Sequence, residues 1–259
     1  MFMDNELFRI PSETFIRKVE FHEEIGSTSD RAIELAALRT CPLPLLVVAG
    51  RQTAGRGRGQ NRWWSAPGAL TFSLVIDGLG LGVPQDRWPR LSLATALVVG
   101  DVIRQYVPPA DVQLKWPNDV FVAGRKVCGI LVEVPGATPG RVVIGVGLNV
   151  NNSLTAAPLE IQESAAALCD VAQQELDLAA ILASVLRGVE TEMSRLRQDE
   201  SGLARRWQPY CLLEGRSVRL LQGRNEHSGV CDSIDDGGAL LLRTGQGTER
   251  FISGTVVAW

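Results

Sequence analysis

The sequence predicts an α/β (α+β) fold in which helices flank a mixed, largely antiparallel sheet, with a small β-barrel near the C-terminal end. Two observations lead to this fold class. Between residues 112 and 150, successive strand-like segments are joined by turns too short for a crossover helix, which makes neighbours antiparallel and disfavours a doubly wound parallel sheet. Before and after them, residues 86–106 and 160–208 carry apolar side chains at helical spacing.

The first hundred residues are expected to alternate between strand and helix. Ser27 or Thr28 is a typical N-cap for an amphipathic pattern that runs through Leu38. Pro89 suits the first turn of a long, mostly buried helix. The ranges are 19–38 for a strand followed by the capped helix, 44–52 and 69–76 for two strands, and 86–106 for the long helix. The glycine-rich and arginine-rich segment between the two strands is therefore expected to be a loop.

Alternating apolar residues then predict four strands around turns at Pro117-Asn118 and Gly124-Arg125. Their ranges are 112–116, 119–123, 126–134 and 141–150. The last of these is expected near an edge of the sheet, where it could pair with a second subunit. A monomer and a homodimer both stay open.

The remainder of the chain divides into a helical part and a β part. Residues 160–208 are rich in Ala, Leu, Glu and Arg and predict two or three helices. After Glu214 the pattern changes to short strands and turns, which predicts a small β-barrel. The expected strands are 217–222, 227–234, 238–243 and 249–259. We therefore expect two domains, 1–213 and 214–259.

The composition is that of a globular protein without a general affinity for nucleic acid. The 259 residues are 45% hydrophobic, and the net charge is -3, so any positive character is local. Five scattered cysteines without C-x-x-C spacing predict free thiols in a reducing cytosol. The N-terminus lacks a signal pattern, and no apolar run reaches the roughly 18 residues of a membrane span. We expect a cytoplasmic protein with no membrane partner.

The loop after residue 52 concentrates positive charge on a flexible backbone. Within GRGRGQNR (55–62) three glycines alternate with arginines, and no acidic residue balances them. Arginine forks hold phosphate oxygens, so the loop is expected to be mobile and to become ordered on a polyanion. A solvated linker or an RNA-binding Gly-Arg segment would give the same run. The adjacent Trp63 and Trp64 favour a ligand with a planar ring.

Lysine is rare in this chain, and two of its three lysines lie within twelve residues. The other 23 basic residues are arginines, and the third lysine, Lys18, lies far away in the sequence. Lysine at both positions 115 and 126 therefore indicates sites that need a compact ammonium. Alternation along the strand from Lys126 places 126, 128 and 130 on one face, and 127, 129, 131 and 133 on the other. Both lysines are equally compatible with ordinary edge-strand positions, and Asn118 and Asp119 with a simple turn.

Four segments together carry a resemblance to a known family. GRGRGQNRWWSAPGAL (55–70), KWPNDVFVAGRKVCGILVE (115–133) and VIGVGLNVNN (143–152), in this order, resemble the biotin protein ligases, and SGVCDSIDDGGALLLR (228–243) is similar to their SH3-like domain. The resemblance covers residues 20–259. It implies a catalytic domain of the class II aminoacyl-tRNA synthetase-like fold followed by an SH3-like barrel. About 20 residues precede the first strand, too few for the DNA-binding domain of larger members, so no DNA partner is expected.

The resemblance also implies an activity and its ligands. The family joins biotin to ATP as biotinyl-5'-AMP, with Mg²⁺, and passes the biotinyl group to a lysine of a biotin carboxyl carrier protein domain. Within the superfamily a lipoate ligase is the alternative, and from a different class a nucleic-acid-binding module that uses the Gly-Arg loop. The tryptophans after the loop argue against the first, and the negative net charge argues against the second.

The residues that match the family's motifs are assigned the family's roles. Arg56, Arg58, Lys115, Asp119 and Lys126 are the expected catalytic residues, with Asp119 also the expected contact of Mg²⁺. Biotin is expected to meet Ser27, Thr28, Ser29, Gln52, Arg56, Gly57, Arg58, Trp63, Lys126, Gly129 and Leu131. ATP is expected to meet Arg58, Trp63, Lys115, Asn118, Lys126 and Asn149. Gly59, Gln60, Asn61 and Arg62 depart from the commoner Arg-Arg-Gly-Arg, so the role of Arg62 stays open.

Overall fold

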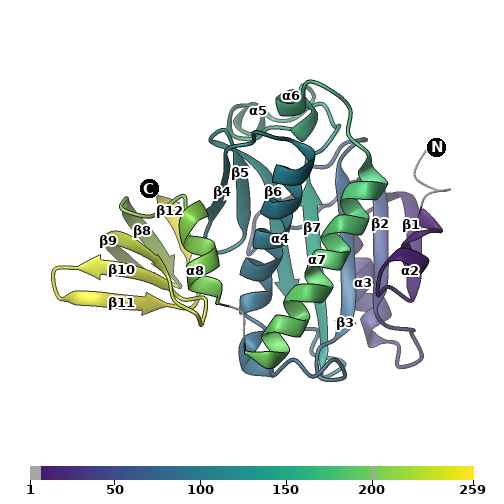
Figure 1. Cartoon of the computed structure of the whole chain (residues 1–259), viewed down its shortest axis with the longest axis horizontal. Helices are drawn as coiled ribbons and strands as arrows, with labels where there is room; N and C mark the ends of the chain where they lie inside the picture. The colour runs from purple at the N-terminus through teal and green to yellow at the C-terminus, as the bar shows by residue number, and fades with distance from the viewer. Residues whose placement is uncertain (1–6, 200–201) are drawn as a thin grey trace.

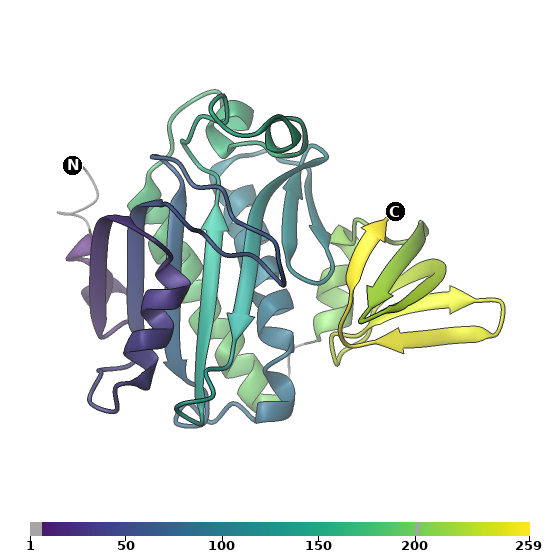
Figure 2. The ribbon, with the colours of Figure 1, turned by 180° about the vertical axis from the view of Figure 1, so that it is seen from behind.

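A computed structural model describes residues 7–199 and 202–259, which form two β-sheets with helices packed on the larger one (Figures 1 and 2). Residues 1–6, where no signal peptide is expected, and residues 200–201, within the expected helical part, lie outside the described residues. No described helix has both the length and the apolar character that crossing a membrane requires. The α/β architecture with a small C-terminal sheet confirms the predicted fold class.

The larger sheet has seven strands in the order β1-β2-β3-β7-β6-β5-β4. Only the pair β1 and β2 is parallel, and the other five pairs are antiparallel, as the short turns predict. The strands are β1 (Lys18–Ile25), β2 (Leu45–Gln52), β3 (Leu70–Asp77), β4 (Val112–Lys115), β5 (Asp119–Val122), β6 (Arg125–Glu133) and β7 (Arg141–Leu148).

Helices cover both faces of this sheet unequally. On one face α4 packs against the sheet and α7 packs against α4, as Figure 1 shows. The two helices approach closely at Gly188, where a Cβ atom would lie 2.4 Å from Val98. On the other face α3 covers only part of β2, β3 and β7 (Figure 2), so that the ends of the central strands stay open for a site. The helices up to this point are α2 (Ile10–Glu13), α3 (Thr28–Ala37), the 3₁₀ turn η1 (Gln85–Arg87), α4 (Arg90–Tyr106), α5 (Leu159–Ser164), α6 (Leu168–Ala172) and α7 (Leu178–Gln198).

The starts of the helices follow from local chemistry. The hydroxyl of Ser27 accepts a hydrogen bond from the backbone N–H of Asp30 at 3.3 Å, which caps α3 as predicted. Pro89 is the N-cap of α4. Asp177 caps α7 by accepting from the N–H of Ala180 at 2.9 Å.

The C-terminal sheet has five antiparallel strands in the order β11-β10-β9-β8-β12. It joins the larger sheet through α8 (Leu203–Trp207) and the 3₁₀ turn η2 (Gln208–Tyr210). The indole N–H of the fully buried Trp116 donates to the carbonyl of Gly238 at 3.0 Å, and the N–H of Leu212 donates to the carbonyl of Leu114. The strands are β8 (Ser217–Gln222), β9 (Asn225–Ile234), β10 (Leu240–Thr244), β11 (Gly247–Phe251) and β12 (Thr255–Ala258).

Three sequence-based expectations are wrong in detail. Strand β7 lies between β3 and β6 rather than at an edge, so it cannot pair with a second subunit. The expected strand over 249–259 is two strands, because the chain turns at Gly254, whose φ of 153° suits glycine. The region 160–208 holds four α-helices among its described residues, since the backbone near Ala165 and Ala166 pairs with Lys126 instead of continuing a helix.

Candidate active site

A cavity of about 600 Å³ opens on the face of the larger sheet that α3 leaves uncovered. Its floor is formed by β6 and β7. The loop between β2 and β3 passes over these two strands, as Figure 2 shows. The turn between β4 and β5, helix α5 and strand β12 of the smaller sheet complete its walls. The cavity is therefore assembled from segments that lie far apart in the sequence.

Strand register explains which side chains face the cavity. One row of directly opposite residues crosses the sheet as Lys115, Asp119, Gly129, Gly147 and Thr71. A second row, two residues along each strand and thus on the same face, consists of Leu131, Gly145 and Ser73. Glycine occupies the centre of both rows, so the floor consists largely of backbone.

The glycines of β7 are required by close neighbours. A Cβ atom on Gly147 would lie 2.3 Å from Cε2 of Trp63, and one on Gly145 would lie 2.6 Å from the hydroxyl of Ser29. The indole of Trp63 thus lies directly against the backbone of β7. Its Nε1 is buried without a hydrogen-bond partner among residues 7–199 and 202–259.

One end of the cavity is a buried network of neutral polar groups. Gln52 Oε1 accepts from the backbone N–H of Thr28 at 2.6 Å and from its hydroxyl at 3.0 Å. The hydroxyl of Ser73 lies 2.8 Å from that of Thr28 and 3.1 Å from that of Ser29. Four side chains from α3, β2 and β3 therefore present amide and hydroxyl groups at one point, suited to a small ligand with both donors and acceptors.

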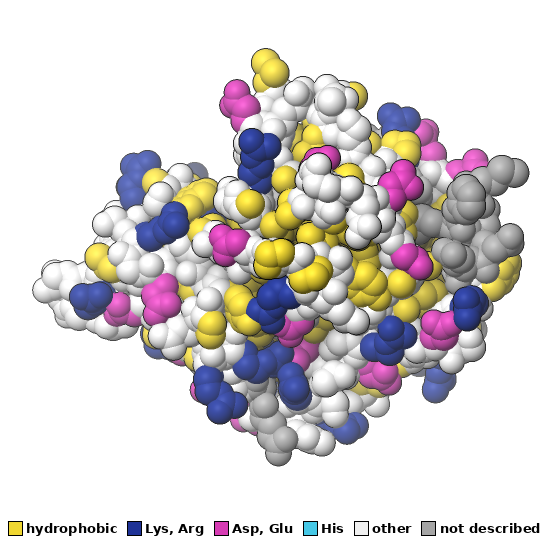
Figure 3. Space-filling view, turned by 45° about the horizontal axis from the view of Figure 1, so that its top comes forward, with side chains coloured by type: hydrophobic (Ala, Val, Ile, Leu, Met, Phe, Trp, Pro, Cys, Tyr) yellow, Lys and Arg dark blue, Asp and Glu magenta, His cyan; other side chains and the backbone are white. Residues whose placement is uncertain are grey.

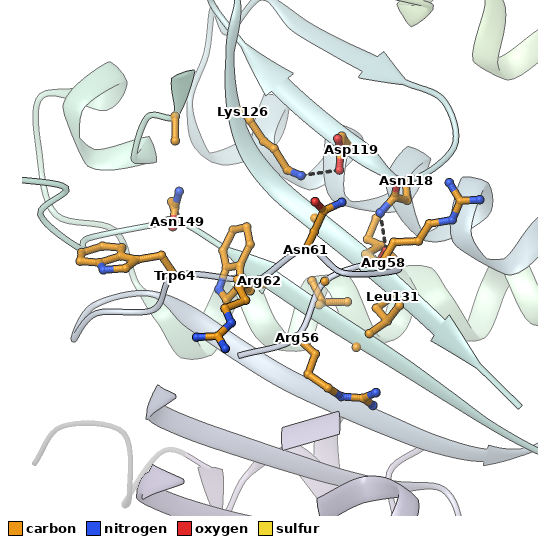
Figure 4. Close-up of a pocket in the computed structure, with 18 of the residues that line it drawn as sticks. Arg56, Arg58, Asn61, Arg62, Trp64, Asn118, Asp119, Lys126, Leu131 and Asn149 are labelled. Atoms are coloured by element: carbon orange, nitrogen blue, oxygen red, sulfur yellow. Dashed lines mark hydrogen bonds and ion pairs between the residues drawn. The ribbon is translucent and has the colours of Figure 1, made fainter. Parts of the chain in front are cut away.

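The other end of the cavity is charged (Figure 4). Lys126 Nζ lies 2.6 Å from Asp119 Oδ1, and Asn118 donates through Nδ2 to the carbonyl of Ile130 at 2.8 Å. Burial lowers the pKa of Lys115 to about 8, a shift that Asp119 opposes and Lys126 reinforces. Burial also lowers the pKa of Arg58, again opposed by Asp119. Arg58, Lys115 and Lys126 together outnumber Asp119 here, so this end suits a polyanion.

The loop between β2 and β3 forms a tight hairpin over the cavity. Arg56 pairs with Arg62 as an isolated β-bridge, and the N–H of Gly57 donates to the carbonyl of Asn61 at 2.9 Å. The guanidinium of Arg56 contacts Glu133 through both terminal nitrogens and Asp30 through Nε at 2.8 Å. It points away from Lys126 and Asp119 (Figure 4). Arg58 instead donates to the carbonyl of Gly254. The expected mobility of the loop stays a prediction.

A β-bulge corrects the expected faces of β6. Val120 lies opposite Cys128, but Phe121 lies opposite Lys126, so Val127 is an extra residue in β6. Simple alternation grouped Lys126 with Cys128 and Ile130. After the bulge, Lys126 lies instead near Gly129, with its Nζ 3.4 Å from the point where a Cβ of that glycine would be.

The groups present fit a Mg²⁺ ion that arrives bound to phosphates, although no cluster of three or more His, Cys, Asp or Glu side chains occurs in the described part of the chain. Mg²⁺ commonly binds through one or two carboxylates together with substrate phosphates. Asp119 supplies one carboxylate at the charged end, and Glu160 lines the same cavity. This donor set matches a shared ion rather than a dedicated protein cage.

Comparison with known proteins shows which family the chain resembles. Residues 23–149 match the biotin/lipoate A/B protein ligase family, and residues 215–259 match the biotin protein ligase C terminal domain. The chain is 36% identical to the biotin--[acetyl-CoA-carboxylase] ligase of Mycobacterium tuberculosis, over 93% of this chain and 89% of that protein. The chain belongs to the biotin protein ligase family.

Further relatives agree with this membership. The chain is 30% identical to the bifunctional ligase/repressor BirA of Bacillus subtilis, over 96% of this chain and 76% of that protein. The solved structure of the biotin protein ligase from Aquifex aeolicus in complex with biotin and ATP matches with a TM-score of 0.79 and 26% identity, covering 93% of this chain and 98% of that chain.

All but one of the residues assigned by the family's motifs line the cavity. Ser27 is the exception, because it caps α3 and does not face the cavity. The others are Thr28, Ser29, Gln52, Arg56, Gly57, Arg58, Trp63, Lys115, Asn118, Asp119, Lys126, Gly129, Leu131 and Asn149. Asn149 is buried and accepts at Oδ1 from Asn152 at 3.2 Å. Arg62, whose role the sequence leaves open, also lines the cavity.

Several residues of the site escape a sequence-based reading of the biotin protein ligase motifs. Gly145 and Gly147 carry a usable signal, because two glycines spaced by two residues must share one face of a strand. Ser73 lies in an apolar strand and has no such signal. Thr255 and Val256 come from the C-terminal sheet, and only the three-dimensional arrangement brings them to the cavity.

Proposed function

We propose that this chain joins biotin to the α-phosphate of ATP and then transfers the biotinyl group to a lysine of a biotin carboxyl carrier protein domain. The observation that carries the proposal is one cavity with a neutral polar end and a cationic end, in a chain that belongs to the biotin protein ligase family. Biotin offers a ureido ring with donors and an acceptor at one end and a carboxylate at the other. The two ends of the cavity suit these two ends of the ligand.

Neutral groups would bind the ureido ring. Thr28, Ser29 and Gln52 offer hydroxyl and amide groups, and Gly129 and Leu131 would form the floor under the rest of the ligand. Trp63 would pack on one side of the site beside the loop, and Gly57 would let the loop backbone approach. Arg56 would hold the loop closed, because both of its carboxylate partners lie on other elements.

The cationic end would carry the first reaction. A carboxylate oxygen of biotin attacks the α-phosphorus, the bond from that phosphorus to the bridging oxygen breaks, and pyrophosphate leaves. Two like unit charges about 4 Å apart repel by roughly 4 kcal/mol at an effective dielectric near 20. Arg58, Lys115 and Lys126 would offset this repulsion and stabilise the charge that develops on the phosphate oxygens. Mg²⁺ held by Asp119 would neutralise further charge on the phosphates, with Asn118 beside it and Asn149 at the adenine edge.

The second reaction needs an open path to the adenylate. The acceptor lysine attacks the acyl carbon as a neutral amine, AMP leaves with the bonding electron pair, and the amine loses one proton. Asp119 would orient the incoming amine. An acyl adenylate is a mixed anhydride that water destroys, so the loop would protect it by excluding water.

A lipoate ligase is the rival within the matched family. The end of lipoate opposite its carboxylate is an apolar chain with a dithiolane ring. That end has no N–H or C=O group to form hydrogen bonds with the buried hydroxyl and amide groups around Gln52. A nucleic-acid-binding role is less favoured still, since acidic and basic side chains are interspersed on the face in Figure 3 and the net charge is -3.

Pyrophosphate release tests the proposal. The protein is incubated with Mg²⁺ and ATP plus either biotin or lipoate, and a parallel sample is titrated with RNA. We expect release that depends on biotin, and label on a carrier domain when one is added. Release with lipoate alone, or RNA binding without either release, would contradict the proposed function.

A further inference from the structure

The C-terminal sheet reaches the charged end of the cavity. Thr255 and Val256 of β12 line the cavity, and the carbonyl of Gly254 just before that strand accepts the hydrogen bond of Arg58. The ring of Trp259, which follows the strand, lies over Lys115 with 3.4 Å between its centroid and Nζ. The smaller sheet thus contacts two of the cations to which the proposed function assigns the phosphates.

Lys115 has few direct partners for a buried cation. The residue is 9% exposed, and its ammonium makes no hydrogen bond or ion pair with any described residue. Asp119 lies directly opposite it in the β-hairpin but makes its short contact with Lys126 instead. The indole face of Trp259 is therefore the direct contact of this ammonium among the described residues. An aromatic face attracts a cation through the negative charge above its ring.

We propose that Trp259 is a positioning residue, which fixes the ammonium of Lys115 at the charged end and so makes the C-terminal sheet part of the nucleotide site. The inference rests on the proposed function, because the phosphates of ATP are the anions that Lys115 would meet. Trp259 itself is 46% exposed and does not line the cavity, so its effect acts through Lys115.

The lysine content of the chain allows a test that needs no activity. Lys18, Lys115 and Lys126 are the only lysines, so mass spectrometry of peptides after limited acetylation with acetic anhydride reports each amine separately. Trp259→Leu removes the aromatic face, which both exposes the amine and removes a group that favours its charged form. We expect acetylation of Lys115 to become roughly 2- to 30-fold faster. Lys18, an exposed residue of β1, is the internal reference.

Kinetics then test the effect on the nucleotide. In biotin-dependent pyrophosphate release, Trp259→Leu is expected to raise the KM for ATP by roughly 2- to 30-fold. The affinity for biotin alone, measured by calorimetry without nucleotide, should stay unchanged, because the polar network around Gln52 is at the other end of the cavity. Trp259→Phe keeps an aromatic face, so its KM for ATP should stay close to that of the unmodified protein.

Val257→Ala is the matched control, since Val257 is an exposed residue of the same strand that does not line the cavity. A double variant adds a second check: Trp259→Leu should change nothing further in a Lys115→Met background. Additive effects of the two substitutions, or unchanged acetylation of Lys115 in Trp259→Leu, would overturn the inference. Faster acetylation with an unchanged KM for ATP would overturn its nucleotide part.

These outcomes are distinct from failure of the proposed function. If the unmodified protein releases no pyrophosphate with biotin, the proposed function fails, while the acetylation rate still decides whether Trp259 holds Lys115. Unfolding of Trp259→Leu would show as faster labelling of Lys126 as well as Lys115, both relative to the exposed Lys18. The acetylation rate of Lys115 would then be measured in Trp259→Phe.

Discussion

Lys126 occupies a position where the shape of the cation matters as much as its charge. Its ammonium contacts Asp119 at 2.6 Å and lies against the bare backbone of Gly129, a space that fits a compact group. A planar guanidinium is larger and directs its hydrogen bonds in a fixed fork. We expect Lys126→Arg to slow single-turnover formation of the adenylate by roughly 100-fold although the charge is kept. Lys18→Arg, on the exposed surface of β1, is the control, and near-normal adenylation in Lys126→Arg would contradict the prediction.

Lys115 predicts a pH dependence of nucleotide binding. Burial lowers its pKa to about 8, so the ammonium is charged below that pH and neutral above it. The KM for ATP should therefore rise between pH 7 and pH 9, by roughly tenfold per unit once the pKa is passed. Adenylation must be measured without the acceptor, because deprotonation of the acceptor lysine favours transfer at high pH. The rise should be absent in Lys115→Arg, whose guanidinium stays charged, and a KM independent of pH in the unmodified protein would refute it.

Gly147 tests whether the backbone floor is necessary. A methyl group at this position would lie 2.3 Å from Trp63, so the indole must move off β7. Crowding of this kind costs about 1 to 3 kcal/mol, which predicts a loss of biotin affinity of roughly tenfold in Gly147→Ala. Isothermal titration with biotin measures it. Gly136→Ala is the matched control, because nothing lies within 4 Å of its added methyl group. Equal affinities of the two variants would show that Trp63 adapts freely.

At the scale of elements, the sequence is most informative where local chemistry decides the structure. The cap at Ser27, the start of α4 after Pro89 and the antiparallel hairpins around residues 117 and 124 are all local features, and the structure confirms each of them. Long-range pairing is different. The bulge at Val127 and the helix break near Ala165 exist because backbone groups bond to segments that are distant in the sequence. The spacing of apolar residues does not indicate which distant segments these are.

The same distinction applies to the site. The rare lysines and the Gly-Arg loop are visible in the sequence, and the fold brings them to one cavity. The contributions of Ser73 and of strand β12 depend on which strands become neighbours. Alternation alone places Lys126 on the wrong face of β6, with Cys128 and Ile130, because it assumes a strand without a bulge.

The loop between β2 and β3 yields a prediction for the whole element. Arg58 links its hairpin to the carbonyl of Gly254, and hydrogen bonds to charged groups are worth about 1.5 to 3 kcal/mol. Arg58→Gly should still form biotinyl-AMP but release it, so that lysines of bystander proteins become labelled about tenfold more. Labelling is followed by avidin blotting against added serum albumin. Gln60→Gly, at the exposed tip of the same loop, is the control. Retention of the intermediate by Arg58→Gly would refute the lid role of the loop.

At the scale of the molecule, the two sheets are joined at their contact surface as well as through the chain. Trp116 bonds to Gly238, Leu212 bonds to Leu114, and the cavity takes walls from both sheets. These hydrogen bonds hold the two sheets in place only while both sheets stay folded. A ligand that binds in the cavity should therefore also stabilise the C-terminal sheet.

Hydrogen exchange measures that coupling directly. Saturation with biotin and an ATP analogue that carries a methylene group in place of the oxygen between the α- and β-phosphates, each at about 100 times its dissociation constant, stabilises the bound state by roughly 2.7 kcal/mol per ligand. We expect slower exchange of the amides of β12, whose Thr255 and Val256 line the cavity, together with those of β6 and β7. The amides of β11, at the far edge of the small sheet, are the internal control and should change less. Biotin alone should protect the polar end around Gln52 and leave β12 nearly unchanged. Equal protection of β11 and β12 would mean general stabilisation, and no protection of β12 would mean that the smaller sheet takes no part in the site.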